Sequence, residues 1–276
     1  MPELPEVETV KEILKKQIIG DTITDITINY SKIIKETDPA TFRQNLIGQT
    51  FRDILRRGKY LVFVLDDYIL LSHLRMEGKY FIKSPNDEIS KHEHIIFRLG
   101  PNKTLRYHDT RKFGTMYLFH TTSFDIVNNM LPLKELGVEP LGSDFTLAYL
   151  KEKLTKSHRS IKTTLLDQSV ISGLGNIYVN EILFLSKIHP LENSDELTDE
   201  DITNIIDNTK RVLNRAIELG GTTIHSFQSA LEVSGRFQNE LRIHMQKICP
   251  VCHGEVSKIY VGQRGTYYCK VCQVKR

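Results

Sequence analysis

All four cysteines of the chain stand in two C-x-x-C pairs near its C-terminus. Cys249 and Cys252 form the first pair, Cys269 and Cys272 form the second, and sixteen residues separate the pairs. This spacing is typical of a zinc ribbon, in which four thiolates surround one Zn²⁺ tetrahedrally. A site closed by four thiolates leaves no position open for catalysis, so we expect one structural zinc ion per chain.

The segment between the two pairs predicts a β-hairpin. β-Branched and aromatic residues at 256–261 and 266–268 flank a Gly262-Gln263-Arg264-Gly265 turn. A redox dithiol is the alternative interpretation of the cysteines, but no strand–helix pattern surrounds them in the sequence. The hairpin therefore favours zinc.

The N-terminus carries a second reactive group. Removal of Met1, which a small second residue favours, would leave Pro2 with a secondary α-amine. Such amines have pKa values of about 7.7–8.0, so a useful fraction is unprotonated at neutral pH. Addition to an aldehyde-level carbon gives an iminium, which is a permanent cation and a strong electron sink. Proline and glutamate are also good first-turn residues, so Pro2, Glu3 and Glu6 alone favour a structural role.

The elements that would position these residues change in type along the chain. A helix is predicted over 5–19, with Val7, Val10 and Leu14 on one face and Gly20 at its end. Short alternating runs then predict strands at 22–30, 50–55, 59–65, 68–74, 79–83, 94–99, 104–107 and 115–119. This regular succession of short strands predicts a β-sandwich or barrel with a helix packed on it.

Helical patterns dominate after residue 131. A linker is marked by Pro132, Gly137, Pro140 and Gly142. Helices are then predicted at 146–154, 160–168, 175–186, 199–219 and 222–231. Residues 192–201 hold six acids and no base, and we interpret them as a solvated loop and helix start with Thr198 as N-cap.

Composition excludes several classes of protein. The 276 residues are 40% hydrophobic and 26% charged, which fits globular domains and excludes a mainly disordered chain. No apolar run approaches the roughly 18 residues of a membrane helix, and the acidic start lacks the apolar segment of a signal peptide. We therefore expect a cytoplasmic protein. Residues 223–276 hold eight Lys or Arg against three Glu, a net +5 within an overall +3. This excess indicates a polyanionic partner, with a solvated basic tail as the alternative.

The N-terminal string Met-Pro-Glu-Leu-Pro-Glu-Val-Glu-Thr resembles the start of the bacterial formamidopyrimidine-DNA glycosylases. Further motifs resemble that family in the same order, up to the Arg264-Gly265-Thr266 run before the last cysteines. They are Arg57-Gly58-Lys59-Tyr60-Leu61, His73-Leu74-Arg75-Met76-Glu77-Gly78, Lys91-His92-Glu93-His94, Asp109-Thr110-Arg111-Lys112-Phe113-Gly114, Leu165-Leu166-Asp167-Gln168 and Gly173-Leu174-Gly175-Asn176-Ile177-Tyr178. The resemblance covers the whole chain, with gaps only in loops.

This resemblance implies a bifunctional DNA glycosylase and AP lyase that excises 8-oxoguanine and formamidopyrimidines from duplex DNA. Such enzymes flip the damaged nucleotide out of the stack into a pocket. By resemblance, Pro2 attacks C1′ and forms a Schiff base, Glu3 is the general acid/base at the sugar, and Lys59 donates a proton. Glu6 supports the N-terminal geometry, and Arg264 assists δ-elimination and grips a phosphate. β- and δ-Elimination then cut the strand.

The resemblance also implies two kinds of DNA contact. Phosphate contacts, which set register, would come from His92, Arg111, Lys162 and Asn176. The gap left by the flipped base would be filled by Met76, Arg111 and Phe113. Core packing is the alternative role for Met76 and Phe113.

The expected fold class is α+β and multidomain. A catalytic β-sandwich with a packed helix would cover 1–131, a linker and helix–two-turn–helix domain 132–234, and a zinc ribbon 235–276. We expect a monomer that binds damaged double-stranded DNA in the bacterial cytosol and needs no membrane or protein partner. Residues 243–248 depart from the family's usual run, and the loop 229–235, which covers the flipped base in the family, is uninformative about the lesion.

Two alternatives remain at this point. An endonuclease VIII-like enzyme for oxidised pyrimidines shares the architecture, but Leu4, where that enzyme usually has Gly, and the gap-filling set favour the purine enzyme. A non-catalytic zinc-ribbon DNA-binding protein is the second alternative. Intact Pro2, Glu3, Lys59 and Arg264 argue against it.

Overall fold

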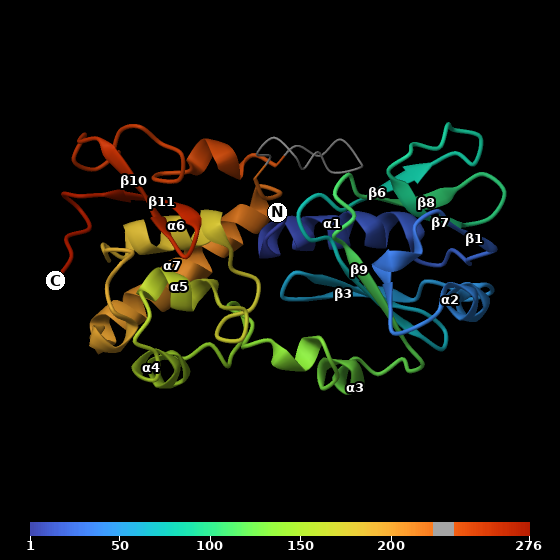
Figure 1. The fold of residues 1–276 in the computed structure, drawn as a ribbon, viewed down its shortest axis with the longest axis horizontal. Coiled ribbons are helices and arrows are strands. Elements are labelled where there is room, and N and C mark those ends of the chain that lie inside the picture. The colour runs from blue at the N-terminus through green and yellow to red at the C-terminus, as the bar shows by residue number, and fades with distance from the viewer. Residues whose placement is uncertain (223–234) are drawn as a thin grey trace. The chain divides into compact units, whose positions relative to one another are not determined.

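A computed structural model describes residues 1–222 and 235–276 (Figure 1). The chain divides into two compact units. The first comprises residues 1–134 and returns at 220–235, and the second comprises 135–219 and 236–276. The first unit is therefore built from two stretches of chain that are far apart in the sequence.

Two β-sheets form the first unit. The four-stranded sheet has the order β1 (Asp25–Ile28), β7 (Glu93–Arg98), β8 (Thr104–His108) and β6 (Lys79–Lys83). The five-stranded sheet has the order β2 (Ile34–Lys35), β9 (Thr115–Phe119), β5 (Ile69–His73), β4 (Tyr60–Val64) and β3 (Asp53–Arg57). All neighbouring strands are antiparallel except β2 and β9. One apolar core joins residues from both sheets, which confirms the sandwich.

Helix α1 (Leu4–Ile18) closes this core by packing against β3 and β4. Val7, Val10, Leu14 and Ile18 recur at helical spacing and are buried. Each such side chain stabilises the unit by about 1.5–3 kcal/mol. The helix ends before Gly20, whose φ of +87° suits glycine.

Two further helices of this unit were not predicted. Helix α2 (Pro39–Leu46) buries Phe42 and Leu46, and its first turn is capped by the Asp38 carboxylate, which accepts the Ala40 and Thr41 N–H groups. Helix α3 (Phe124–Asn128) is a single short segment capped by Ser123. Short 3₁₀ helices lie at η1 (Ser31–Ile33) and η2 (Leu133–Glu135).

The second unit is helical with one hairpin. Its helices are α4 (Leu147–Thr155), α5 (Ile161–Leu166), α6 (Asn176–Leu185) and α7 (Asp199–Glu218), with 3₁₀ helices η3 (Ser194–Glu196) and η4 (Phe237–Glu240). Strands β10 (Val256–Val261) and β11 (Arg264–Cys269) form the hairpin, which packs against α6. All but the first residue of the predicted helix at 222–231, and all but the last residue of the loop at 229–235, lie outside the described residues.

The hairpin turn is shorter than predicted. Val261 pairs with Arg264, so only Gly262 and Gln263 form the loop, and both have positive φ, as a type I′ turn requires. Arg264 is therefore the first residue of β11 and is exposed. Its guanidinium projects from a fixed hairpin end.

The acidic run at 192–201 is not the fully solvated segment we predicted. Thr198 does cap α7, in a reciprocal arrangement with Asp201. Glu192 and Asp201, however, are buried, and both accept hydrogen bonds from Arg276. The carboxylates at the two ends of this acidic run thus both bind Arg276.

The predicted division into three domains stays a prediction. The chain passes between the two compact units at 134/135, 219/220 and 235/236. Within the part of the chain that the structure describes, no helix is both long and apolar enough to cross a membrane.

Candidate active site

The buried carboxylate of Glu6 organises the N-terminus of the first unit. Its Oε2 accepts the Glu3 N–H at 2.9 Å, while its Oε1 accepts the Thr222 N–H at 2.7 Å and the Thr222 hydroxyl at 3.1 Å. Pro2 and Glu3 are buried, whereas Met1 is 37% exposed. Glu6 therefore fixes the backbone that carries Pro2 and Glu3.

The return of the chain at Thr222 depends on glycine. Gly221 has a φ of +77°, and a Cβ there would lie 2.7 Å from Oε1 of Glu6. A side chain at this position would strain the backbone and push against the buried carboxylate. Sequence reasoning assigned Glu6 a supporting role but missed Thr222, which stands 216 positions away.

Lys59 lies in the two-residue turn between β3 and β4, and both of these strands pack against α1. Gly58 precedes it with a φ of +55°, as a type II′ turn requires at its first position. The side chain of Lys59 is only 5% exposed. A tight turn thus holds an ammonium group inside the unit.

His73 is the buried neighbour of this ammonium group. It pairs with Tyr60 across β4 and β5, and the two rings lie edge to face at 4.5 Å. Burial, together with the charges of Arg75 and Lys59, lowers the pKa of His73 to about 3. The imidazole is therefore neutral at physiological pH, and its Nδ1 accepts the Arg75 N–H at 2.9 Å. His73 stands in one of the motifs that resemble the family, but the sequence indicated no role for it.

The predicted gap-filling residues stand on two turns of the first unit. Met76 is half-buried in the turn between β5 and β6, next to Arg75, which has a φ of +54°. Phe113 is 52% exposed, and the Arg111 guanidinium lies 4.6 Å from its ring centroid. Phe113 thus lies outside the core, while Met76 is only partly covered.

His92 is half-buried before β7, and its Nδ1 has no hydrogen-bond partner among the described residues. Its carbonyl accepts the Asp109 N–H at 2.9 Å. The ring of His108 lies 5.5 Å from the His92 ring. His92 thus stands directly before β7 with one buried ring nitrogen that no described residue binds.

In the second unit, Asn176 is the first residue of α6 and follows Gly175. Its side chain contacts the hairpin. Its Nδ2 donates to the Gly265 carbonyl at 2.9 Å, and its Oδ1 is buried without a hydrogen-bond partner among the described residues. The start of α6 also carries the positive end of the helix dipole, which favours anions. Helix start and hairpin thereby lie side by side (Figure 1).

Lys162 has surroundings that the sequence did not indicate. Its side chain is fully buried, and its Nζ donates to Asn180 Oδ1 and to Thr266 Oγ1, each at 2.7 Å. The Thr266 hydroxyl in turn donates to the Arg264 carbonyl at 2.9 Å. Lys162 thus supports the backbone of Arg264, and direct contact with a phosphate would require the hairpin to move.

Glu181 of α6 ties down the chain that leads to the hairpin. Its buried carboxylate accepts the N–H groups of Arg242, Ile243 and His244 at 2.8–3.0 Å. Burial raises the pKa of Glu181, against the effect of these three bonds. The start of the segment 243–248, which departs from the family pattern, is therefore held on α6, whereas Met245 and Ile248 are exposed.

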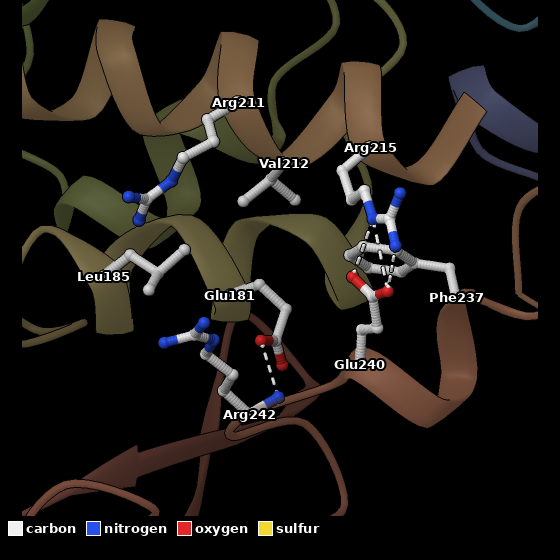
Figure 2. A pocket seen from close by; sticks show the side chains of 8 residues that line it. All are labelled: Glu181, Leu185, Arg211, Val212, Arg215, Phe237, Glu240 and Arg242. Atoms are coloured by element: carbon white, nitrogen blue, oxygen red, sulfur yellow. Dashed lines mark hydrogen bonds and ion pairs between the residues drawn. The ribbon is translucent and has the colours of Figure 1, made fainter. Parts of the chain in front are cut away.

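A cavity of about 180 Å³ lies beside Glu181 (Figure 2). The residues that line it come from α6, α7, η4 and the short segment after η4: Glu181, Leu185, Arg211, Val212, Arg215, Phe237, Glu240 and Arg242. Arg215 bridges to Glu240 at 2.6 Å and so links α7 to η4. The cavity contains none of the predicted site residues.

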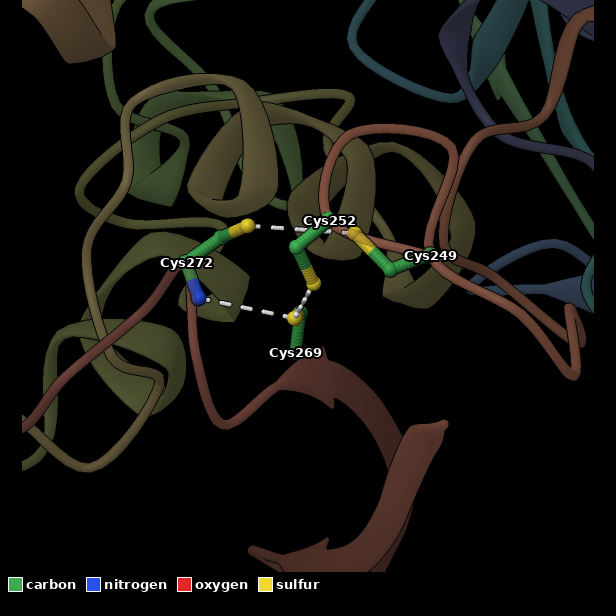
Figure 3. A group of neighbouring side chains, drawn as sticks. All are labelled: Cys249, Cys252, Cys269 and Cys272. Carbon is green, nitrogen blue, oxygen red and sulfur yellow. Dashed lines mark hydrogen bonds between the residues drawn. The ribbon is translucent and has the colours of Figure 1, made fainter. Parts of the chain in front are cut away.

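The four cysteines converge in the second unit (Figure 3). Their sulfurs all lie within 4.8 Å of one another, with Cys249–Cys272 at 3.8 Å and Cys252–Cys269 at 3.3 Å. A tetrahedral ion with Zn–S bonds of about 2.3 Å needs sulfurs about 3.8 Å apart. The cluster therefore fits a metal ion, and Phe184 and Ile243 pack beneath it.

Comparisons with known proteins define the class of this chain as DNA glycosylase. The model of the formamidopyrimidine-DNA glycosylase N-terminal domain matches residues 1–116, and the H2TH domain model of the same enzymes matches residues 136–228. The chain belongs to the formamidopyrimidine-DNA glycosylase family. This assignment confirms the resemblance drawn from the motifs.

Individual relatives match over nearly the whole chain. The formamidopyrimidine-DNA glycosylase of Oceanobacillus iheyensis is 45% identical, covering 99% of this chain and 98% of its own. That of Bacillus subtilis is 44% identical, with both chains fully covered. The crystal structure of a Lactococcus lactis FPG variant in complex with Fapy-dG-containing DNA is similar, with a TM-score of 0.93 at 42% identity. The match covers 99% of this chain and all of the Lactococcus lactis chain.

The predicted site residues are distributed over both units. Pro2, Glu3, Glu6 and Lys59 belong to the first unit, as do the residues predicted to contact DNA at 76, 92, 111 and 113. Arg264, Lys162, Asn176 and the cysteines belong to the second. The role of each residue stays a prediction.

Proposed function

We propose that this chain excises oxidised purines from damaged duplex DNA through a Schiff base at Pro2 and then cuts the strand by β,δ-elimination. After removal of Met1, the Pro2 amine attacks C1′ of the flipped nucleotide, and the base leaves with its bonding electrons. Glu3, the general acid/base, protonates the ring oxygen O4′ as the C1′–O4′ bond breaks, which opens the sugar and leaves the iminium. Loss of the C2′ proton from the iminium then expels the 3′-phosphate, and the second elimination expels the 5′-phosphate.

The observation that carries this proposal is the buried acceptor under the N-terminus. The Glu6 carboxylate fixes the Glu3 N–H, so the first residues have one backbone geometry instead of a frayed end. Lys59 adds a nearly buried cation in the same unit. Arg264, exposed at the end of β11, supplies the positive charge we assign to a departing phosphate.

Borohydride trapping tests the chemistry directly. The protein is incubated with a duplex that contains 8-oxoguanine opposite cytosine, and sodium borohydride reduces any Schiff base to a stable amine. We expect a covalent adduct that peptide mass spectrometry maps to Pro2. Protein that still carries Met1 is the matched control, because it has every side chain but a blocked proline nitrogen. Absence of an adduct with the processed protein would refute the lyase mechanism.

Oxidised pyrimidines are the second candidate substrate. The wild-type Lactococcus lactis enzyme, at 42% identity, was crystallised with DNA containing an oxidised pyrimidine. A parallel duplex with 5-hydroxycytosine therefore belongs in the same assay. Faster excision of the pyrimidine would favour the endonuclease VIII-like alternative.

We also propose that the cysteine cluster holds one structural Zn²⁺. Four sulfur ligands at this spacing suit zinc, which would fix the base of the hairpin that carries Arg264. The reaction itself needs no step at this ion. We propose the bacterial cytosol, where chromosomal DNA lies, as the place of action.

A further inference from the structure

A single buried phenol lies beneath both turns that carry the predicted gap-filling residues. Tyr107 of β8 is fully buried, and its hydroxyl points at Gly78 and Gly114. Gly78 ends the turn that carries Met76, and Gly114 follows Phe113. The two turns belong to separate stretches of the first unit, and Tyr107 contacts both.

The contact at each glycine is too close for any side chain. A Cβ on Gly114 would lie 2.7 Å from Cζ of Tyr107 and closer still to the hydroxyl. A Cβ on Gly78 would likewise meet the hydroxyl, and it would lie 2.9 Å from Cα of Leu74. Neither glycine has a positive φ, so the need for glycine at both positions comes from Tyr107 and its surroundings.

Asp109 connects the phenol to the second turn. Its carboxylate accepts the N–H groups of Arg111, Phe113 and Gly114, each at 2.9 Å. The Tyr107 hydroxyl lies 3.4 Å from Asp109 Oδ2, the oxygen that also accepts the Phe113 and Gly114 N–H groups. Burial and the Asp109 charge raise the pKa of Tyr107, so the phenol keeps its proton and is the donor. The turn that displays Arg111 and Phe113 is thus built on one carboxylate.

We propose that Tyr107 and Asp109 are positioning residues that set the spacing between Met76 and the Arg111–Phe113 pair. This inference rests on the proposed function, because the spacing matters only if these side chains enter the DNA stack. A wedge must match the gap left by one nucleotide, and a displacement of about 1 Å costs up to 100-fold in rate. A rigid phenol between two close-packed turns supplies this fixed distance.

The test displaces the Arg111–Phe113 turn and then relieves the displacement. Gly114→Ala places a methyl group against the hydroxyl and Cζ of Tyr107, and the double variant Gly114→Ala/Tyr107→Leu removes both atoms. Tyr80→Phe is the matched control, since Tyr80 is also buried in this sheet but its hydroxyl donates to Ser72 Oγ at 2.7 Å. Each protein is assayed for 8-oxoguanine excision from duplex DNA and for nicking at a preformed abasic site.

We expect Gly114→Ala to lower excision roughly tenfold or more and abasic-site nicking by less than about threefold. Tyr107→Phe should lower excision about fivefold, as loss of one hydrogen bond does. The double variant should excise faster than Gly114→Ala alone, because the atoms that the methyl group meets are gone. Tyr80→Phe should stay within about twofold of the unaltered protein. 2-Aminopurine beside the lesion should report less unstacking with Gly114→Ala.

Equal losses on both substrates, or no rescue by the double variant, would overturn the proposal. If Gly114→Ala does not fold, as judged by its melting temperature, the comparison of Tyr107→Phe with Tyr80→Phe decides, and equal excision by these two also overturns it. Failure of the proposed function is distinguishable, because the unaltered protein would then process neither substrate.

Discussion

Replacement of Glu6 by glutamine tests whether its carboxylate assembles the N-terminal site. Glutamine keeps the length of the side chain but exchanges one oxygen for an NH₂ group. Oε1 serves two donors of Thr222 and Oε2 serves the Glu3 N–H. Either orientation of the amide therefore sets an NH₂ group against at least one buried donor.

The magnitude follows from that loss. A buried donor without its acceptor costs about 1–3 kcal/mol in free energy of unfolding. For a unit of roughly 150 residues, each kcal/mol lowers the melting temperature by about 2–4 °C, so the total shift is roughly 2–12 °C. The amide loses one hydrogen bond when its NH₂ group faces Glu3 and two when it faces Thr222, so the released N–H belongs to Glu3. We therefore also expect a roughly tenfold or greater loss of excision rate.

Glu12→Gln provides the matched control. Glu12 stands on the same helix with a side chain that is 53% exposed, and its replacement removes the same charge. Its effect should stay within about 0.5 kcal/mol. Calorimetry and excision of 8-oxoguanine are measured for both variants. A Glu6→Gln protein that melts and reacts like the Glu12→Gln protein would refute the role of the carboxylate.

Two further predictions concern the second unit. Chelation of the metal should unfold the hairpin that carries Arg264 and weaken DNA binding at least about tenfold, a loss of about 1.4 kcal/mol; unchanged fluorescence anisotropy after metal loss, verified by mass spectrometry, would contradict this. Burial, helped by the charge of Lys162, lowers the pKa of His244 to about 4 from 6.5. The unfolded chain therefore binds this proton first, and urea titrations should show the free energy of unfolding falling by up to a few kcal/mol between pH 6.5 and 4. His244→Gln should flatten this slope and His158→Gln, at a 90% exposed side chain, should not; equal slopes in both would disprove the assignment.

Local patterns predicted much of the fold. Alternation located the strands of the sandwich to within a few residues, except the two-residue strand β2, which was not predicted. The cysteine spacing anticipated the sulfur cluster. Helix α6 begins at Asn176, one residue from the predicted start, because Gly175 and the apolar run after it are local signals. Helix α2 also had a local signal, since Asp38 followed by Pro39 is a good cap and first residue, but the prediction omitted it.

Contacts between distant positions could not be predicted in this way. Nothing near Glu6 in the sequence indicates Thr222, and nothing near Glu181 indicates the three amide groups that it binds around Ile243. The sequence around Lys162 suggests a surface cation, because its partners Asn180 and Thr266 are far from it along the chain. Periodicity reports which face of an element is apolar, whereas these polar networks depend on which elements meet.

The shared acceptor under the N-terminus has a consequence for biosynthesis. The Glu6 carboxylate accepts two hydrogen bonds from Thr222, so the first helix lacks them until that residue has left the ribosome. At roughly 5–20 residues per second, the delay is on the order of 10–40 s. The N-terminal residues are thus synthesised first but gain these two contacts late. Met1 is accessible to an aminopeptidase during this interval.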